Sequence, residues 1–121
     1  MVTSTRSRRV FAYDQPCDMR KQYDSLATLV KHHLGKDLLR GDLFLFVGRN
    51  RTRAKVLYFD GTGMCLLCKR LAKGRFAAPW EGRTELTETE LELFLEGAEL
   101  VGRMALSPSV VTYTAHHPDF R

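Results

Sequence analysis

Apolar residues recur along the chain at the spacings of several short strands. Residues 43–47 are apolar at every position, as expected for a strand that is covered on both faces. Residues 54–59 place alternate side chains on the two faces of a strand, and residues 64–71 form a returning strand. Shorter runs at 10–13 and 75–78 predict a first and a further strand. The pattern therefore predicts an antiparallel β-meander of about four or five strands.

The two turns of this meander differ in composition. Residues 60–63 read DGTG, a turn cluster whose glycines can take the positive φ of a tight hairpin. Residues 49–53 read RNRTR, which places three arginines at one hairpin tip, where they repel one another. This second turn therefore indicates an anionic partner.

Two segments have the spacing of amphipathic helices. Apolar positions recur at helical intervals over residues 18–34, where Asp18 can cap the start and Gly35 can end the helix.

The second predicted helix begins at Thr87 and extends to Glu96. Thr87 and Glu90 form a T-x-x-E capping box, while Leu86 and Leu91 occupy the two positions of a hydrophobic staple. With two packed helices beside the meander, the predicted fold class is α+β.

Length and composition indicate one globular unit. The 121 residues, 44% of them hydrophobic and 27% charged, suit a single domain with one buried core. We expect a flexible basic leader at 1–9, a single α+β domain at 10–100 and a variable C-terminal tail at 101–121.

The chain lacks the marks of a membrane or secreted protein. No stretch approaches the roughly 18 apolar residues of a membrane span, and residues 1–9 lack the apolar core of a signal peptide. Three cysteines, an odd number, fit a reducing compartment. We expect a cytoplasmic protein with no membrane contact.

Charge is unevenly distributed. Residues 84–100 hold six of the 14 acidic residues and no basic one, so the rest of the chain carries a net charge of about +11 although the whole carries +5. The basic body and the acidic segment are therefore expected to meet different partners.

Basic residues crowd the arginine-rich turn and the connection after residue 68, so these adjacent ends of the meander could present one phosphate-binding surface. No helix-turn-helix, RNA-recognition or zinc-finger motif accompanies them. We therefore expect weakly sequence-specific binding of duplex DNA through these candidates: Arg49, Arg51, Arg53, Lys55, Lys69, Arg70, Lys73 and Arg75.

The acidic segment forms the outer face of the second predicted helix. Its acids would repel DNA and could dock a basic region of a protein partner. The candidate partner-binding residues are Glu88, Glu92, Glu96 and Glu99.

The sequence gives little support for metal or catalytic chemistry. Cys65 and Cys68 lie three residues apart on a predicted strand and so point to opposite faces, where we expect both to be buried small hydrophobes. Asp18 and Asp60 have structural explanations as a helix cap and a turn residue. We therefore expect no catalytic residue, no metal and no cofactor.

One resemblance covers most of the chain, because matching positions keep their order and spacing from about residue 10 to residue 100. They are Asp18, Met19, Arg20, Lys21, Asp24, Leu26, Gly48, Arg49, Lys55, Leu57, Asp60, Gly63, Cys65, Leu66, Lys69, Arg70, Leu71, Gly74, Arg75, Phe76, Pro79, Leu95, Glu96 and Gly97. The chain resembles the TnpB, or second-reading-frame, accessory proteins of insertion-sequence group sixty-six. The resemblance implies a role in transposition beside a separate catalytic transposase.

Three functional hypotheses follow. The first is a non-enzymatic accessory factor that contacts DNA, the transposase or both through its basic hairpin surface. The second is a pure protein adaptor without DNA contact. The third is a small toxin-type ribonuclease, since such enzymes also combine compact α+β folds with basic faces.

Overall fold

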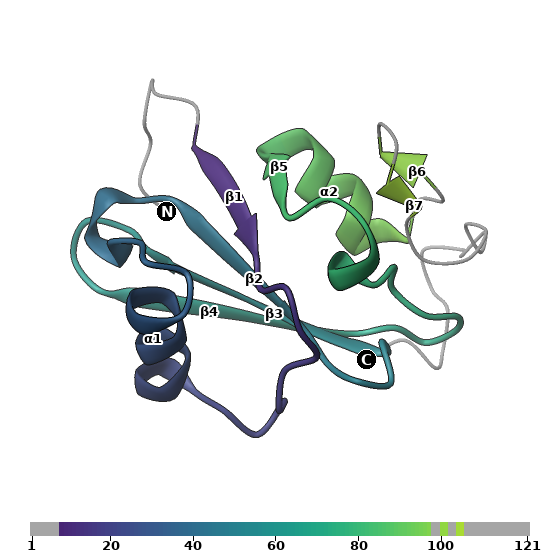
Figure 1. Ribbon diagram of the computed structural model, residues 1–121, viewed down its shortest axis with the longest axis horizontal. Helices are drawn as coiled ribbons and strands as arrows, with labels where there is room; N and C mark the ends of the chain where they lie inside the picture. The colour runs from purple at the N-terminus through teal and green to yellow at the C-terminus, as the bar shows by residue number, and fades with distance from the viewer. Residues whose placement is uncertain (1–7, 98–99, 102–103, 106–121) are drawn as a thin grey trace.

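A five-stranded sheet with one helix on each face forms the body of the protein. The computed structural model describes residues 8–97, 100–101 and 104–105, and Figure 1 shows these elements. In spatial order the strands are β4 (Met64–Arg70), β3 (Arg53–Phe59), β2 (Leu43–Val47), β1 (Arg9–Ala12) and β5 (Glu85–Thr87). A separate pair, β6 (Leu100–Val101) and β7 (Met104–Ala105), completes the described strands.

The sheet is mixed, so the prediction of a purely antiparallel meander was wrong for one strand pair. Strands β2, β3 and β4 form antiparallel hairpins, but β1 runs parallel to β2. A parallel pair needs a crossover, and the connection contains α1 (Tyr23–His32) and the short helix η1 (Leu38–Arg40). This long connection thus carries the chain back to the end of the sheet at which β1 began, so that β2 runs in the same direction.

The far edge of the sheet also differs from the prediction. Residues 75–78 form no strand, although Phe76 is fully buried, and the short helix η2 (Pro79–Glu81) follows them. The fifth strand is instead β5, which pairs antiparallel with β1 directly before α2 (Glu88–Glu96). Its three residues were too few to show a strand period in the sequence.

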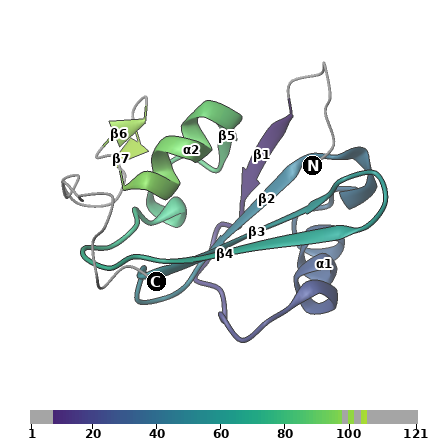
Figure 2. The same ribbon diagram turned by 180° about the vertical axis from the view of Figure 1, so that it is seen from behind.

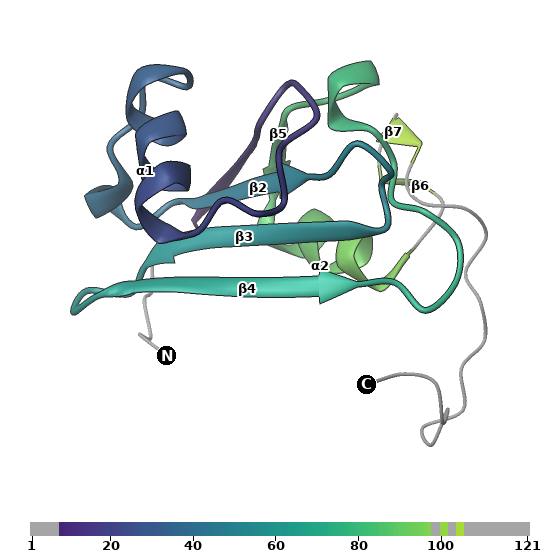
Figure 3. The ribbon, with the colours of Figure 1, turned by 90° about the horizontal axis from the view of Figure 1, so that it is seen from below.

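Two apolar clusters occupy the two faces of the sheet. Phe44 and Phe46 of β2 join the cluster under α1, whereas Leu43, Leu45 and Val47 join the cluster that includes Leu91 and Phe94 of α2. Figures 2 and 3 show the two helices on opposite sides of the strands. All five β2 residues are buried, which confirms the prediction from its unbroken apolar run.

The first helix starts later than the sequence indicated. Its N-cap is Gln22, whose backbone N–H donates to the Ser25 hydroxyl at 3.1 Å. Asp18, the predicted cap, instead accepts from the backbone N–H of Arg20 at 2.9 Å and so forms a local turn. The predicted end is confirmed, because Gly35 has φ 65° and the Lys36 N–H donates to the Val30 carbonyl at 3.0 Å.

The second helix has the predicted start. The Thr87 hydroxyl accepts from the Glu90 N–H at 3.1 Å, and the Thr87 N–H donates to Glu90 Oε1 at 2.9 Å. Leu86 and Leu91 are both buried in the same cluster, as a staple requires. Gly97 ends the helix at φ 86°.

The turn between β3 and β4 depends on one carboxylate. Asp60 Oδ1 accepts from the backbone N–H groups of Thr62 at 2.9 Å and Gly63 at 3.0 Å. These hydrogen bonds lower the pKa of Asp60 from 3.8 to about 2. The turn therefore prefers the ionised carboxylate.

We expect this preference to appear in the acid stability of the protein. The pKa of Asp60 is lower in the folded state, so its contribution is complete above pH 3.8 and is lost as the pH falls toward 2. The difference in unfolding free energy between the parent and Asp60→Asn should therefore shrink over this range. Urea titrations between pH 5 and pH 2 measure it, and a difference that stays constant would contradict the assignment.

Candidate nucleic-acid interface

The two basic segments predicted from the sequence lie side by side at one end of the sheet. Arg53 and Arg70 are register partners on β3 and β4. Beyond them, the Leu71 N–H donates to the Thr52 carbonyl at 2.8 Å, and the Phe76 N–H donates to the Arg51 carbonyl at 2.6 Å. We call this surface the basic rim and define it as Arg49, Arg51, Arg53, Lys69, Arg70, Lys73 and Arg75.

Backbone geometry holds the arginine turn in a fixed shape. The Arg51 N–H donates to the Gly48 carbonyl at 2.9 Å, and the Gly48 N–H donates to the Arg53 carbonyl at 3.0 Å. Arg51 has φ 60°, and within the described residues it is the one non-glycine residue with positive φ. An L-residue in this region costs roughly 1–2 kcal/mol, a cost that Gly would avoid. Such positions are common at ligand-binding sites.

Most cations of the basic rim differ from Arg8, Arg9 and Arg83 because they lack a carboxylate partner. Arg8, Arg9 and Arg83 each bind a carboxylate within 2.9 Å. By contrast, no carboxylate of the described residues pairs with these rim side chains: Arg49, Arg51, Arg53, Arg70, Lys73 and Arg75. These six side chains thus gather positive charge that no described carboxylate compensates.

Lys55 does not lie on this surface, although the sequence placed it among the candidates. It is 7% exposed, and its Nζ donates to the Lys21 carbonyl at 2.7 Å. Lys55 therefore anchors the segment before α1 to β3.

A cleft of about 190 Å³ opens beside the arginine turn. Cys17, Asp18 and Met19 form one wall, and residues 48–53 form the other. Burial raises the pKa of the Cys17 thiol to about 11, and hydrogen bonds from the guanidinium and the backbone N–H of Arg20 hold the pKa of Asp18 far below its usual value. This contact could not be predicted from the sequence, since a parallel bridge between Cys17 and Gly48 joins segments that are far apart in the chain.

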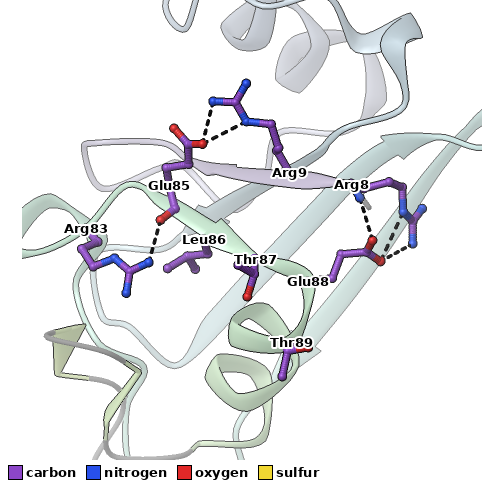
Figure 4. A pocket seen from close by; sticks show the side chains of 8 residues that line it. All are labelled: Arg8, Arg9, Arg83, Glu85, Leu86, Thr87, Glu88 and Thr89. Atoms are coloured by element: carbon purple, nitrogen blue, oxygen red, sulfur yellow. Dashed lines mark hydrogen bonds and ion pairs between the residues drawn. The ribbon is translucent and has the colours of Figure 1, made fainter. Parts of the chain in front are cut away.

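The acidic helix is partly engaged within the protein. Glu88 accepts from the backbone N–H of Arg8 at 2.9 Å and from its guanidinium, which lowers the pKa of Glu88. Figure 4 shows this pair in a hollow of about 450 Å³, where Arg9 also binds Glu85. Glu92 and Glu96 are exposed, and Glu99 lies outside the described residues.

The cysteines do not form a shared site on β4. Cys65 is half-buried and contacts Asp60 Oδ2 at 3.5 Å, whereas Cys68 is exposed, so the expectation that both are buried was wrong. Cys68 is exposed because β4 lies at the edge of the sheet. No group of three His, Cys, Asp or Glu residues in the described part of the chain could hold a metal ion.

Helices of the described ranges are all too short or too polar to cross a bilayer.

Comparison with known proteins points to one family. Residues 8–104 match the family model of IS66 Orf2-like proteins. The chain is 37% identical to the uncharacterized protein y4hO of Sinorhizobium fredii, over 82% of this chain and 88% of the relative. It is 32% identical to the uncharacterized protein y4jC of the same organism, over 82% of this chain and 86% of the relative. No solved structure matches the chain.

The packing of Met19 against the arginine turn can be tested at Gly48. A Cβ at this position would lie 2.7 Å from Met19 Cγ, whereas a Cβ at Gly63 would meet nothing within 4 Å. We expect Gly48→Ala to lower the unfolding free energy by about 1–3 kcal/mol through overpacking. The control Gly63→Ala should change it by about 0.5 kcal/mol or less.

A double-mutant cycle identifies the cause. In a Met19→Ala background, the Gly48→Ala change should cost about 0.5 kcal/mol or less, because the clashing side chain is gone. An equal cost in both backgrounds, measured by urea unfolding, would show that Met19 does not fill this space.

Proposed function

Because the chain belongs to the family of IS66 Orf2-like proteins, which associates it with an insertion-sequence element, we propose that it is a non-enzymatic accessory factor of transposition that contacts duplex DNA through the basic rim.

The observation that carries this proposal is the distribution of paired and unpaired cations. Intramolecular carboxylates neutralise Arg8, Arg9 and Arg83, whereas six rim cations at one end of the sheet have no carboxylate partner among the described residues. A DNA duplex presents phosphates at close spacing, and each cation that neutralises one releases a counterion. The rim thus has the electrostatic character of a phosphate-binding surface.

The elements that carry the rim determine the kind of contact. Its residues come from strand ends and the connections that follow them, whereas α1 and α2 lie on the two faces of the sheet. Base readout in the major groove commonly uses a helix or a two-stranded ribbon that enters the groove. Contacts from turns suit the phosphate backbone, which supports affinity with weak sequence preference.

The state of the polar groups near the rim supports a non-enzymatic role. Burial keeps the Cys17 thiol protonated, and Arg20 engages Asp18. Asp60 is occupied by its turn hydrogen bonds at the other end of β4. A ribonuclease would need a general base close to the bound phosphate.

Exposed acids on α2 support a second contact, with the transposase of the same element. Glu92 and Glu96 are exposed on a helix that is well capped and anchored by Leu91 and Phe94. Glu88 is less suitable, because Arg8 binds it. If the rim met the acidic surface of a protein instead of DNA, the chain would be a pure adaptor.

We expect duplex binding with a strong salt dependence. Arg49→Ala/Arg53→Ala should weaken binding and lower the slope of log K against log salt by about 1.8, since two phosphate contacts are lost. The matched control is Lys31→Ala/Lys36→Ala, which removes equal charge before the start of β2, whereas the rim follows its end. Fluorescence anisotropy with a labelled duplex measures both. Equal slopes in the two variants, or a flat salt response of the parent, would favour the adaptor hypothesis.

The acidic contact requires its own test. Glu92→Lys/Glu96→Lys should leave the fold intact, because exposed charges contribute little to stability, and should weaken co-purification with the transposase. The control Asp24→Lys/Glu81→Lys makes the same change in net charge at other exposed sites. This control should not weaken co-purification with the transposase. Equal capture of the transposase by both variants would show that α2 does not dock it.

A further inference from the structure

The outer edge of β4 is the least protected surface of the described sheet. β4 is the terminal strand in the sheet order and has seven residues without a bulge in its pairing with β3. Leu67 is 48% exposed and Met64 is 38% exposed, and the Cys68 side chain is also exposed. Long edge strands with apolar side chains are templates for pairing with another strand.

The hydrogen bonds of the hairpin show which backbone groups point outward. The Asp60 N–H donates to the Gly63 carbonyl, and the Leu71 N–H donates to the Thr52 carbonyl. Hydrogen-bonded pairs alternate along an antiparallel ladder, so Cys65, Leu67 and Lys69 direct their N–H and C=O groups toward β3. The four outward residues are therefore Met64, Leu66, Cys68 and Arg70.

From this geometry we infer that β4 pairs antiparallel with β4 of a second copy of the chain, with Leu67 at the two-fold axis. In this register Leu66 faces Cys68 of the other copy, and Met64 faces its Arg70. All four outward residues then exchange backbone hydrogen bonds, which no shifted register achieves within the strand. The two Leu67 side chains form a pair without backbone hydrogen bonds, where side chains approach closely.

Charge favours this arrangement over a parallel one. Lys69 and Arg70 lie at one end of β4, and the Asp60 turn lies at the other. Antiparallel pairing places the cationic end of each strand beside the turn of the other copy, where Asp60 is ionised at neutral pH. Parallel pairing would place like charges directly opposite, which destabilises a strand pair.

The opposite edge of the sheet limits the assembly to two copies. β5 has three residues, and an ion pair between Arg9 and Glu85 flanks it. Short, charged edges resist further pairing. The resulting dimer is one continuous sheet with two basic rims, whose Arg70 Cα atoms are about 20 Å apart along the strands. The β4 dimer is proposed from the strand geometry and does not depend on whether the basic rim binds DNA.

The experiment measures mass and cross-linking of the full chain. We expect the parent to have twice the mass of 13.9 kDa in analytical ultracentrifugation at about 100 µM. Leu67→Lys should give a monomer with an unchanged circular dichroism spectrum, because two lysines would meet at the axis. Leu93→Lys, at an exposed apolar position on α2 (38% exposed, against 48% for Leu67), should remain a dimer.

A disulfide identifies the register. In a Cys65→Ser/Cys68→Ser background, Leu67→Cys should oxidise to a covalent dimer, since paired Cα atoms about 4.5 Å apart suit a disulfide. At about 100 µM protein, Leu67→Cys should form its disulfide about tenfold faster than Leu93→Cys. Strand pairing raises the effective concentration of the second thiol to the millimolar range. The outward amides of Leu66 and Cys68 should exchange slowly in the dimer and rapidly in Leu67→Lys.

Three results would overturn the inference. The first is a monomeric parent at this concentration. The second is a dimer that Leu67→Lys leaves intact and that cross-links equally through Leu93→Cys. The third is slow exchange of the Leu66 and Cys68 amides in a monomer, which would show that another segment of the same chain covers β4.

Discussion

Strand β2 must be covered on both faces, and the other elements are arranged around this requirement. Its five side chains are all buried, with Phe44 and Phe46 on one side and Leu43, Leu45 and Val47 on the other. A single antiparallel sheet with one solvated face could not hide them. The crossover through α1 covers one face and makes β1 parallel to β2. The other face is covered by α2, which follows β5 later in the chain. Burial of one strand thus explains both the layered architecture and the mixed sheet.

The same arrangement separates the charges. β5 and α2 return to β1, which brings the acidic segment next to Arg8 and Arg9 and neutralises them. The end of β2 and the connection after β4 meet elsewhere, where no acidic segment follows them. The chain therefore gathers six cations without a carboxylate partner among the described residues at one end of the sheet, although its basic residues are spread over the whole sequence. The strained Arg51 and the tight contact between Gly48 and Met19 hold this end in a defined shape. A fixed shape favours binding, because less conformational entropy is lost on association.

The two edges of the sheet are protected to different degrees. β5 is short and flanked by ion pairs, whereas β4 is long, regular and partly apolar. A pair of β4 strands would satisfy the open edge and present two basic rims related by symmetry. Two-fold symmetry is the commonest form of protein association, and it suits a duplex whose two strands are themselves related by two-fold axes.

The sequence by itself determined the elements whose signal is local. The unbroken apolar run of β2, the Asp60 turn and the capping box of Thr87 and Glu90 depend on neighbours within a few residues, and each was predicted correctly. The start of the first helix was a local exception, because Asp18 binds Arg20 two residues away and the N-cap is Gln22. Tertiary structure decided what depends on distant partners. It made β1 parallel to β2. It also buried Lys55 under the Lys21 carbonyl and paired Glu88 with Arg8, eighty positions away in the chain. Charge and exposure of a single residue are set by whatever the fold brings beside it, and residue spacing carries no record of that neighbour.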